Sequence, residues 1–251
     1  MITRKLSGWS EYKYYSCDIF SPKNIEELKL FLKKNYSKKK IITRGHGCSN
    51  GDQAVNANGI VVETNNLDKI ISYNKINKTI EVESGVKLSD ILMITMKDDL
   101  FFPCIPGGLD ITVGGAISNN VHGKDCFKNG YFENNVSELK IISSNGDLTN
   151  VSSESNKELF ESIFSSLGLI GIIYSVVLKL KEIDSPILEI DTKVAKNKNE
   201  LKNFFYNVDE KNDYAIAWLD FSSKNKLRGI FSTAKFADKN KLSYTDKEKY
   251  K

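Results

Sequence analysis

The sequence predicts an α+β protein built around two glycine-rich segments. Short runs of β-branched residues are typical of strands, and apolar residues at helical spacing are typical of helices; both kinds of segment alternate along the chain. Glycine gathers in residues 44–52 and 106–123. Of the 251 residues, 40% are hydrophobic and 27% are charged, which is the composition of a globular protein with a packed core.

The N-terminal part is expected to contain a helix that is followed by a strand. Ser21 is a favourable N-cap and Pro22 fits the first helical position, so we expect the helix to begin there. The strand expected at 41–43 leads directly into the first glycine-rich segment. The helix carries one apolar face at helical spacing, made of Ile25, Leu28 and Leu32.

Further helices and strands are expected up to residue 183. A helix is predicted over 88–97, and a capped helix from Ser155 carries apolar residues on one face. The Asn145-Gly146 pair predicts a turn between two strands. Runs of β-branched residues predict strands at 60–62, 70–73, 79–83, 139–143, 147–151 and 172–180.

The character of the sequence changes after residue 183. Pro186 interrupts the pattern, and a Lys/Asn-rich helix and three strands are expected beyond it, at 187–190, 214–221 and 227–232. We therefore expect one domain over residues 1–185 and the N-terminal part of a second α+β domain over residues 186–251. Because these strands do not complete a core, we expect the chain to be a fragment of a longer protein.

The charged residues do not indicate a nucleic-acid surface. The net charge is +4, but nearly all the cations are lysines, and the arginines are Arg4, Arg44 and Arg228. A nucleic-acid surface would favour clustered arginine with interleaved aromatic residues. A solvated, lysine-rich surface is the better interpretation.

Neither a metal site nor a membrane span is predicted. The cysteines form no C-x-x-C pair, and the two histidines supply no zinc spacing. No apolar signal segment opens the sequence, and the longest apolar stretch, 167–178, is shorter than the roughly 18 residues that a membrane helix needs. We therefore expect a cytoplasmic protein with reduced thiols.

The first glycine-rich segment, residues 44–52, reads Arg-Gly-His-Gly-Cys-Ser-Asn-Gly-Asp. Glycines separated by small polar residues after a strand can present several backbone N–H groups to a phosphate, and Arg44 adds a cation. The spacing is neither that of a P-loop nor that of a Rossmann fingerprint. On these residues alone, a glycine-rich hairpin turn is an equal alternative.

The second segment, residues 106–124, favours the phosphate interpretation. It is rich in glycine, and Asp110 is the only carboxylate between Gly107 and Gly123, so a pyrophosphate would meet little repulsion. Gly114-Gly115 are expected to open a short helix whose N-terminal amides face a phosphate or a carbonyl. Two phosphate-binding segments in one domain predict a site for a dinucleotide.

Together, Arg-Gly-x-Gly-x-Ser and Pro-Gly…Thr-Val-Gly-Gly-Ala-Ile…His-Gly-Lys resemble the PCMH-type FAD-binding domain of the vanillyl-alcohol oxidase flavoprotein family. The resemblance covers residues 5–183, including Leu-Ser-Gly-Trp near the start and the 168–173 stretch near the end. It is greatest for the decaprenylphosphoryl-ribose oxidase group, whose first loop also ends in Gly-Asp, here Gly51-Asp52. It implies two α/β subdomains, an FAD cofactor and an FAD-linked oxidoreductase that acts on a CH–OH group.

The resemblance also implies where FAD binds. Residues 43–53 would wrap its pyrophosphate, the His122 region would border the isoalloxazine, and the 168–173 turn would meet the adenine. The implied cofactor-binding residues are Arg44, Gly45, His46, Gly47, Cys48, Ser49, Asn50, Gly51, Asp52, Gly107, Thr112, Val113, Gly114, Gly115, Ser118, Asn119, His122, Gly123, Gly168 and Ile173.

His122 and Lys124 are the candidate catalytic residues. An unperturbed histidine pKa of about 6.5 would suit a base, but we place a structural or substrate-orienting role of His122 ahead of proton abstraction. Lys124 is a candidate for binding an anionic substrate, and a plain surface lysine is the alternative.

Several positions depart from the family pattern. Covalent members carry a flavin-linking histidine four residues after the loop arginine, where this chain has Cys48, and members that use cysteine place it where this chain has Gly108. We therefore expect non-covalent FAD, with Cys48 as a packing residue. The branched Val121 before His-Gly implies a dehydrogenase that prefers an acceptor other than O2. Ser165-Ser166 replaces a glycine pair beside the adenine.

The reaction implied is hydride transfer from a carbinol of a sugar-like substrate to flavin N5. Three alternatives stay open: an aldonolactone or polyol oxidoreductase of the same family, a flavin-binding module without turnover, and a sugar-nucleotide-binding domain that reuses the fold. For the group with the greatest resemblance, the substrate is a polyprenyl-phosphoryl ribose, oxidised at its 2-position before an NAD(P)H-dependent reductase acts. A lipid-linked substrate of this kind makes a peripheral membrane location the alternative to a purely cytoplasmic one.

Overall fold

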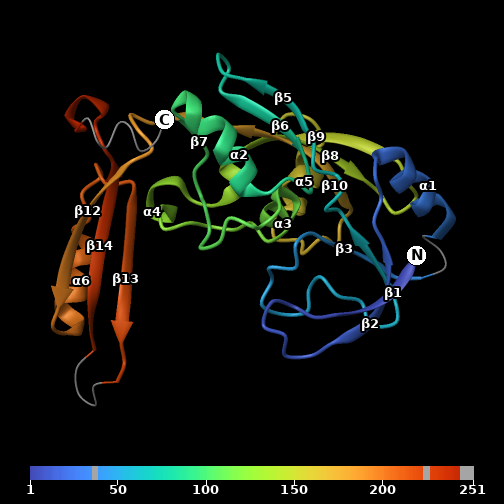
Figure 1. Cartoon of the computed structure of the whole chain (residues 1–251), viewed down its shortest axis with the longest axis horizontal. Coiled ribbons are helices and arrows are strands. Elements are labelled where there is room, and N and C mark those ends of the chain that lie inside the picture. Colours follow the sequence, from blue (N-terminus) through green and yellow to red (C-terminus); the bar gives the residue numbers. More distant parts are fainter. Residues whose placement is uncertain (36–38, 223–226, 244–251) are drawn as a thin grey trace.

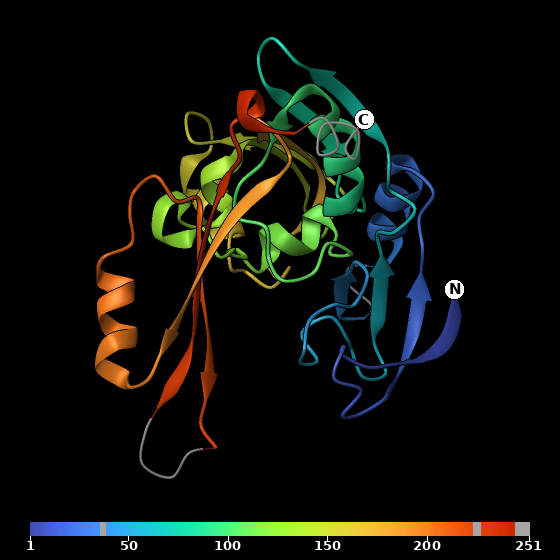
Figure 2. The same cartoon turned by 60° about the vertical axis from the view of Figure 1, so that its left-hand side comes forward.

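The computed structural model describes residues 1–35, 39–222 and 227–243. Three sheets and the helices packed on them make up the fold, which confirms the predicted α+β class (Figure 1). A four-stranded and a five-stranded sheet lie side by side in the first 183 residues, and a three-stranded sheet follows (Figure 2). Two short strands, β7 (Leu100–Phe101) and β11 (Lys181–Glu182), form a separate antiparallel pair.

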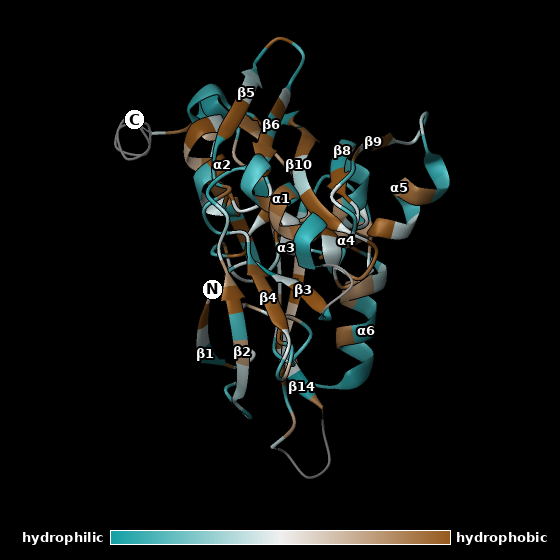
Figure 3. Ribbon diagram, turned by 90° about the vertical axis from the view of Figure 1, so that its right-hand side faces the viewer, coloured by the Kyte–Doolittle hydropathy of each residue, from teal (hydrophilic) through white to brown (hydrophobic). Residues whose placement is uncertain are grey.

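The first sheet has the strand order β1-β2-β4-β3. The strands are β1 (Ile2–Leu6), β2 (Tyr15–Phe20), β4 (Ile60–Glu63) and β3 (Ile41–Arg44). β1 and β2 are antiparallel, whereas β4 is parallel to both β2 and β3. The inner strand β4 is hydrophobic for most of its length, and the edge strand β1 is mostly hydrophilic (Figure 3). That polarity is why β1 was not predicted.

Helix α1 (Ile25–Asn35) begins later than predicted. Asn24, not Ser21, caps it, because Oδ1 of Asn24 accepts a hydrogen bond of 2.9 Å from the N–H of Glu27. Ser21 instead donates its hydroxyl hydrogen to Glu63 of the adjacent strand β4 at 3.1 Å. The predicted apolar face is confirmed: Leu28 and Leu32 are buried, and Ile25 is partly buried in the same cluster. Phe31, which was not part of the prediction, is buried beside them.

The second sheet has the order β5-β6-β10-β8-β9, and all its neighbouring strands are antiparallel. Its strands are β5 (Ile70–Asn74), β6 (Thr79–Glu83), β10 (Ile172–Lys179), β8 (Val136–Ile142) and β9 (Leu148–Ser152). All five were predicted within a few residues. The turn predicted at Asn145-Gly146 lies between β8 and β9, where Gly146 has a φ of +88°.

Short helices and connecting segments bury one face of the second sheet. They are α2 (Leu88–Thr95), η1 (Met96–Asp98), α3 (Val113–Ser118), α4 (Cys126–Asn129), η2 (Phe132–Asn135) and α5 (Lys157–Ile163). Helix α5 begins after Asn156, whose φ is +55°, and not at Ser155. The shared core is apolar, and Phe102 and Phe132 meet edge to face in it with 6.2 Å between ring centroids.

The third sheet has the order β12-β14-β13, and α6 (Lys198–Tyr206) covers one of its faces (Figures 1 and 2). Its strands are β12 (Leu188–Ala195), β14 (Arg228–Phe236) and β13 (Tyr214–Asp220), and a single-turn helix, η3 (Lys239–Lys241), follows them. β12 and β14 extend beyond the predicted ends at 190 and 232. The added residues mix polar and apolar side chains without a clear strand pattern, and pairing along the whole length of both strands keeps them in the sheet.

Contacts at one end of the third sheet join it to helix α4 and to the β7–β11 strand pair. The Phe236 ring packs edge-on against Phe101, with 5.2 Å between centroids. Asp213 forms ion pairs with Lys128 at 3.1 Å and Lys181 at 3.6 Å. No helix within the described ranges is both long enough and apolar enough to cross a membrane.

Replacing Phe132 by alanine should strongly destabilise the second sheet and its helices. The side chain is fully buried, and loss of its packing is expected to lower the free energy of unfolding by about 3–5 kcal/mol. Phe221→Ala is the matched control, because Phe221 is 77% exposed and its loss should change stability by no more than about 0.5 kcal/mol. Urea denaturation of both variants measures the difference; similar values for the two would contradict this assignment of the core.

Candidate functional site

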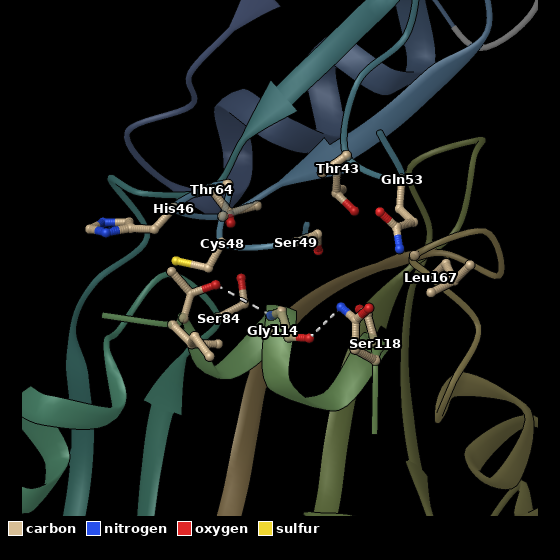
Figure 4. Close-up of a pocket in the computed structure, with 18 of the residues that line it drawn as sticks. Thr43, His46, Cys48, Ser49, Gln53, Thr64, Ser84, Gly114, Ser118 and Leu167 are labelled. Carbon is tan, nitrogen blue, oxygen red and sulfur yellow. Dashed lines mark hydrogen bonds between the residues drawn. The ribbon is translucent and has the colours of Figure 1, made fainter. Parts of the chain in front are cut away.

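A cavity of about 310 Å³ lies between the first and second sheets (Figure 4). The loop after β3 and the end of β4 form one wall, and the end of β6, helix α3 and the start of β10 form the other. The lining residues are Thr43, Gly45, His46, Gly47, Cys48, Ser49, Asn50, Gln53, Ala54, Thr64, Ser84, Ile111, Thr112, Gly114, Gly115, Ser118, Asn119, Val121, Leu167, Gly168, Ile172 and Ile173. The structure thus brings the two predicted glycine-rich segments together at one cavity.

The two glycine-rich segments touch at Gly45 and Thr112. A Cβ atom on Gly45 would overlap the Thr112 hydroxyl, so only glycine allows this approach. The same Thr112 hydroxyl caps α3 by accepting a hydrogen bond of 3.3 Å from the N–H of Gly115. The contact therefore fixes the loop after β3 against the first turn of α3.

The first segment is not a hairpin turn. Residues 45–59 connect β3 to β4, and these strands are parallel. Gly47 has a φ of +71°, and a Cβ there would overlap the Arg44 guanidinium, which lies beneath the loop. Arg44 donates a hydrogen bond of 3.3 Å to the Ala54 carbonyl. Burial lowers its pKa, but an arginine stays charged, so a positive charge lies behind the cavity wall.

The loop after β3 offers free backbone donors, whereas helix α3 does not. Among the described residues, none accepts a hydrogen bond from the backbone N–H groups of residues 45–51. The N–H groups of Val113, Gly114 and Gly115 are instead bonded to Val86 O, Ser84 O and Thr112 Oγ1. Of the two partners expected for the first amides of α3, a phosphate or a carbonyl, the fold supplies carbonyls to Val113 and Gly114, and no donor is left for a phosphate.

An N-terminal turn holds the loop from outside the cavity. The Trp9 N–H donates to the Ser49 carbonyl at 2.8 Å, and the Ser10 hydroxyl donates to the Asn50 carbonyl at 2.6 Å. Gly8 lies directly against the Gly51 carbonyl, where a Cβ atom would overlap the oxygen. These bonds fix the carbonyls of the loop and so fix the direction of its free N–H groups.

His46 and Cys48 both line the cavity. Partial burial and then the nearby Lys87 lower the pKa of His46. Burial and then the Asp110 carboxylate raise the pKa of the Cys48 thiol, whose sulfur lies 3.8 Å from the Asp110 carbonyl oxygen. At neutral pH, Cys48 is therefore a protonated thiol and a poor nucleophile.

A strained turn closes the far end of the cavity. Ser165, Leu167 and Gly168 all have positive φ, at +61°, +55° and +78°. Leu167 donates its N–H to the Ser118 carbonyl at 2.9 Å, which ties the turn to α3. A Cβ on Gly168 would lie 2.7 Å from the Thr43 hydroxyl, so glycine again allows the two sheets to approach.

Residues 19–152 match the family model of an FAD binding domain. The chain belongs to this family. FAD is therefore the cofactor that the fold implies, which confirms the resemblance found in the sequence.

Curated relatives of this FAD-binding chain include several oxidoreductases. The decaprenylphosphoryl-beta-D-ribose oxidase of Mycolicibacterium smegmatis is 27% identical over 226 residues, which cover 88% of this chain and 49% of that protein. The L-gulonolactone oxidase of Bos taurus is 27% identical over 70% of this chain and 40% of its own length. Cytokinin dehydrogenase 2 of Arabidopsis thaliana is 32% identical over 61% of this chain and 30% of its own length. The chain thus spans about half or less of the length of these relatives.

The cavity fits FAD in three respects. No Asp, Glu, Lys or Arg is among its lining residues, so a pyrophosphate would meet no carboxylate. Glycines line it at Gly45, Gly47, Gly114, Gly115 and Gly168, which leaves room for a ligand close to the backbone. One buried hydroxyl in the wall, that of Ser84, has no hydrogen-bond partner within the described part of the chain.

Some of the predicted cofactor-binding and catalytic residues lie outside the cavity lining. Val113 is in the core, Gly107 is exposed, and Asp52 accepts a hydrogen bond from the Tyr15 hydroxyl. The exposed His122 and Lys124 lie on the segment that follows α3, where the Tyr131 ring meets the His122 ring edge-on at 5.8 Å. The full set outside the lining is Arg44, Gly51, Asp52, Gly107, Val113, His122, Gly123 and Lys124.

Other cavity residues were missed by sequence reasoning, namely Ala54, Thr64, Ser84, Ile111 and Leu167. Thr64 and Ser84 share a signal that would have found them. Each is a small polar residue directly after a strand, β4 or β6, and the ends of these two strands meet at the same cavity.

Ser10→Ala should weaken FAD binding through the loop that Ser10 holds. Without the bond to the Asn50 carbonyl, the loop is less fixed, and we expect the Kd for FAD to rise by about three- to tenfold. Flavin fluorescence titration measures the Kd. Ser10→Thr keeps the hydroxyl and should restore the wild-type value. A lower melting temperature of the apoprotein with an unchanged Kd would show that Ser10 matters only for folding.

Proposed function

We propose that the protein is an FAD-dependent oxidoreductase that oxidises a carbinol of a sugar-like substrate, with FAD in the cavity between the first two sheets. The observation that carries this proposal is the neutral, glycine-lined cavity formed by the two segments of the FAD-binding family. Two of the relatives described above are named as oxidases of sugar derivatives, which supports the substrate class. We further propose residues 1–185 as the FAD-binding domain and 186–251 as part of a substrate domain.

The cavity residues suggest how FAD would be held. The free N–H groups of residues 45–50 would bind the pyrophosphate, with the charge of Arg44 behind them. The 168–173 turn would meet the adenine, and Ser118 and Asn119 would lie beside the isoalloxazine. When bound, FAD would supply the hydride acceptor, and the protein would supply binding, orientation and exclusion of side reactions.

His122 and Lys124 would act on the substrate at the edge of the cavity. Both side chains are exposed, and Val121, the residue before them, lines the cavity. We assign substrate orientation to His122 and binding of an anionic group, such as a phosphate, to Lys124. An exposed ammonium group is well suited to that second role.

Two substrate classes follow from the relatives. A polyprenyl-phosphoryl ribose, oxidised at its 2-position, fits the relative that matches 88% of this chain, and its keto product would pass to an NAD(P)H-dependent reductase. Such a lipid-linked substrate would bring the protein to a membrane surface. An aldonolactone or polyol is the second candidate, favoured by the L-gulonolactone oxidase match.

Anaerobic reduction tests the oxidoreductase proposal. The FAD-loaded chain should absorb at about 450 nm, and the correct substrate class should bleach this band in the absence of oxygen. We expect slow recovery in air, because the branched Val121 lines the cavity and narrows access to it. Binding of FAD without bleaching by either class would favour a module without turnover. Absence of flavin binding would favour a sugar-nucleotide-binding domain instead.

FAD should be released when the protein is denatured. Cys48 is the thiol of the cavity, and its raised pKa leaves little thiolate to attack a flavin. Acid precipitation should leave the yellow colour in the supernatant. Colour that stays with the precipitate would contradict non-covalent binding.

In the native protein, bound FAD should protect Cys48 from alkylation while the exposed Cys126 still reacts, which peptide mass spectrometry resolves.

A further inference from the structure

We propose that the Ser84 hydroxyl is a direct hydrogen-bonding ligand of FAD, left without a partner by folding and satisfied when the cofactor binds. This inference rests on the proposed placement of FAD in the cavity. It assigns a cofactor contact to a residue outside both glycine-rich segments.

The backbone of Ser84 is fixed from both sides. Its N–H donates to the Tyr174 carbonyl at 2.8 Å, and its carbonyl accepts from the Gly114 N–H at 2.9 Å. A Cβ on Gly114 would lie 2.9 Å from the Ser84 Cβ, so α3 packs directly on this residue. The preceding Glu83 is buried and accepts hydrogen bonds from the Tyr174 hydroxyl and the Lys69 N–H. Every polar group of the Ser84 main chain is thus used in joining β6, β10 and α3.

The side chain of Ser84 is the group that folding leaves over. The residue is 1% exposed, and its hydroxyl has no hydrogen-bond partner among the described residues. Buried polar groups in folded proteins are nearly always paired, because an unpaired one costs free energy. Of the described residues with such unpaired buried side-chain atoms, Ser84 is the one that lines the cavity, so its hydroxyl is the one that a ligand there could complete.

The neighbouring polar side chains do not satisfy this hydroxyl. Figure 4 shows Ser84 beside Gly114, facing the loop that carries Cys48. Cys48 is directed to the Asp110 carbonyl at 3.8 Å, and the Thr64 hydroxyl to the Arg44 carbonyl at 3.4 Å. A serine hydroxyl both donates and accepts, and it turns among three staggered positions, so it can follow a polar atom of a bound ligand.

The chain offers a matched control in Thr95. Its hydroxyl is also buried and unpaired, but Thr95 ends helix α2 and does not line the cavity. Thr95→Val removes that hydroxyl at nearly constant volume. Ser84→Ala removes the corresponding group from the cavity wall.

The two variants should separate stability from binding. Both apoproteins should melt at a temperature equal to or above that of the wild type, because each loses an unpaired buried hydroxyl. Ser84→Ala should raise the Kd for FAD about tenfold in a fluorescence titration of the apoprotein, whereas Thr95→Val should leave it unchanged. Ser84→Ala would then leave the stability of the apoprotein unchanged or higher and would lower its affinity for FAD.

Two outcomes would overturn the inference: an unchanged Kd in Ser84→Ala, or an equal rise in Kd in Thr95→Val. A third variant separates this failure from failure of the proposed FAD site. Ser118→Trp places an indole in the cavity and should abolish FAD binding if the cofactor lies there. Lost binding in Ser118→Trp with an unchanged Kd in Ser84→Ala contradicts only the role of Ser84. Unchanged binding in a folded Ser118→Trp protein contradicts the site itself.

Discussion

The approach of Gly45 to Thr112 is the contact on which the rest of the site depends. One hydrophobic cluster joins β4 of the first sheet to β8 and β10 of the second. The loop after β3 reaches Thr112 because Gly45 has no side chain to stand between them. Thr112 uses the same hydroxyl to begin α3, so the contact also fixes the helix that forms the opposite wall. Gly168 repeats the arrangement against Thr43 at the far end. The cavity therefore depends on how closely a glycine backbone approaches a threonine side chain at each end.

Hydrogen-bond use decides which part of this cavity is free to bind an anion. The first amides of α3 are consumed by Val86, Ser84 and Thr112, so the helix start serves folding. The loop of residues 45–50 keeps its N–H groups, and the Trp9 and Ser10 bonds hold its carbonyls from behind. A binding loop must be rigid and yet leave its N–H groups without partners inside the protein. A donor that is already held in place loses little entropy when the ligand binds.

The sequence predicted the parts of this fold that local patterns encode. β-branched runs located all five strands of the second sheet, and the glycine-rich segments located both cavity walls. Strands β1 and β2 were not predicted. β1 is an exposed, polar edge strand without a β-branched run, and β2 buries only Cys17 and Ile19, so neither contains a continuous apolar run. The place of Ser84 directly after a predicted strand could have marked it as a candidate, but the unpaired state of its hydroxyl could not be predicted locally. Whether this hydroxyl finds a partner depends on which strands and helices surround Ser84, and only the folded chain shows that none of the described residues supplies one.

The third sheet is attached to the segment of chain that also borders the cavity. The Ala215 N–H donates to the Lys124 carbonyl at 2.9 Å, so β13 begins on the segment that carries His122. Asp213, the residue before β13, pairs with Lys128 at the end of that segment and with Lys181 of β11. Residues 121–128 therefore border the cavity at Val121 and anchor the third sheet at Lys124 and Lys128, so one short stretch of chain serves both features.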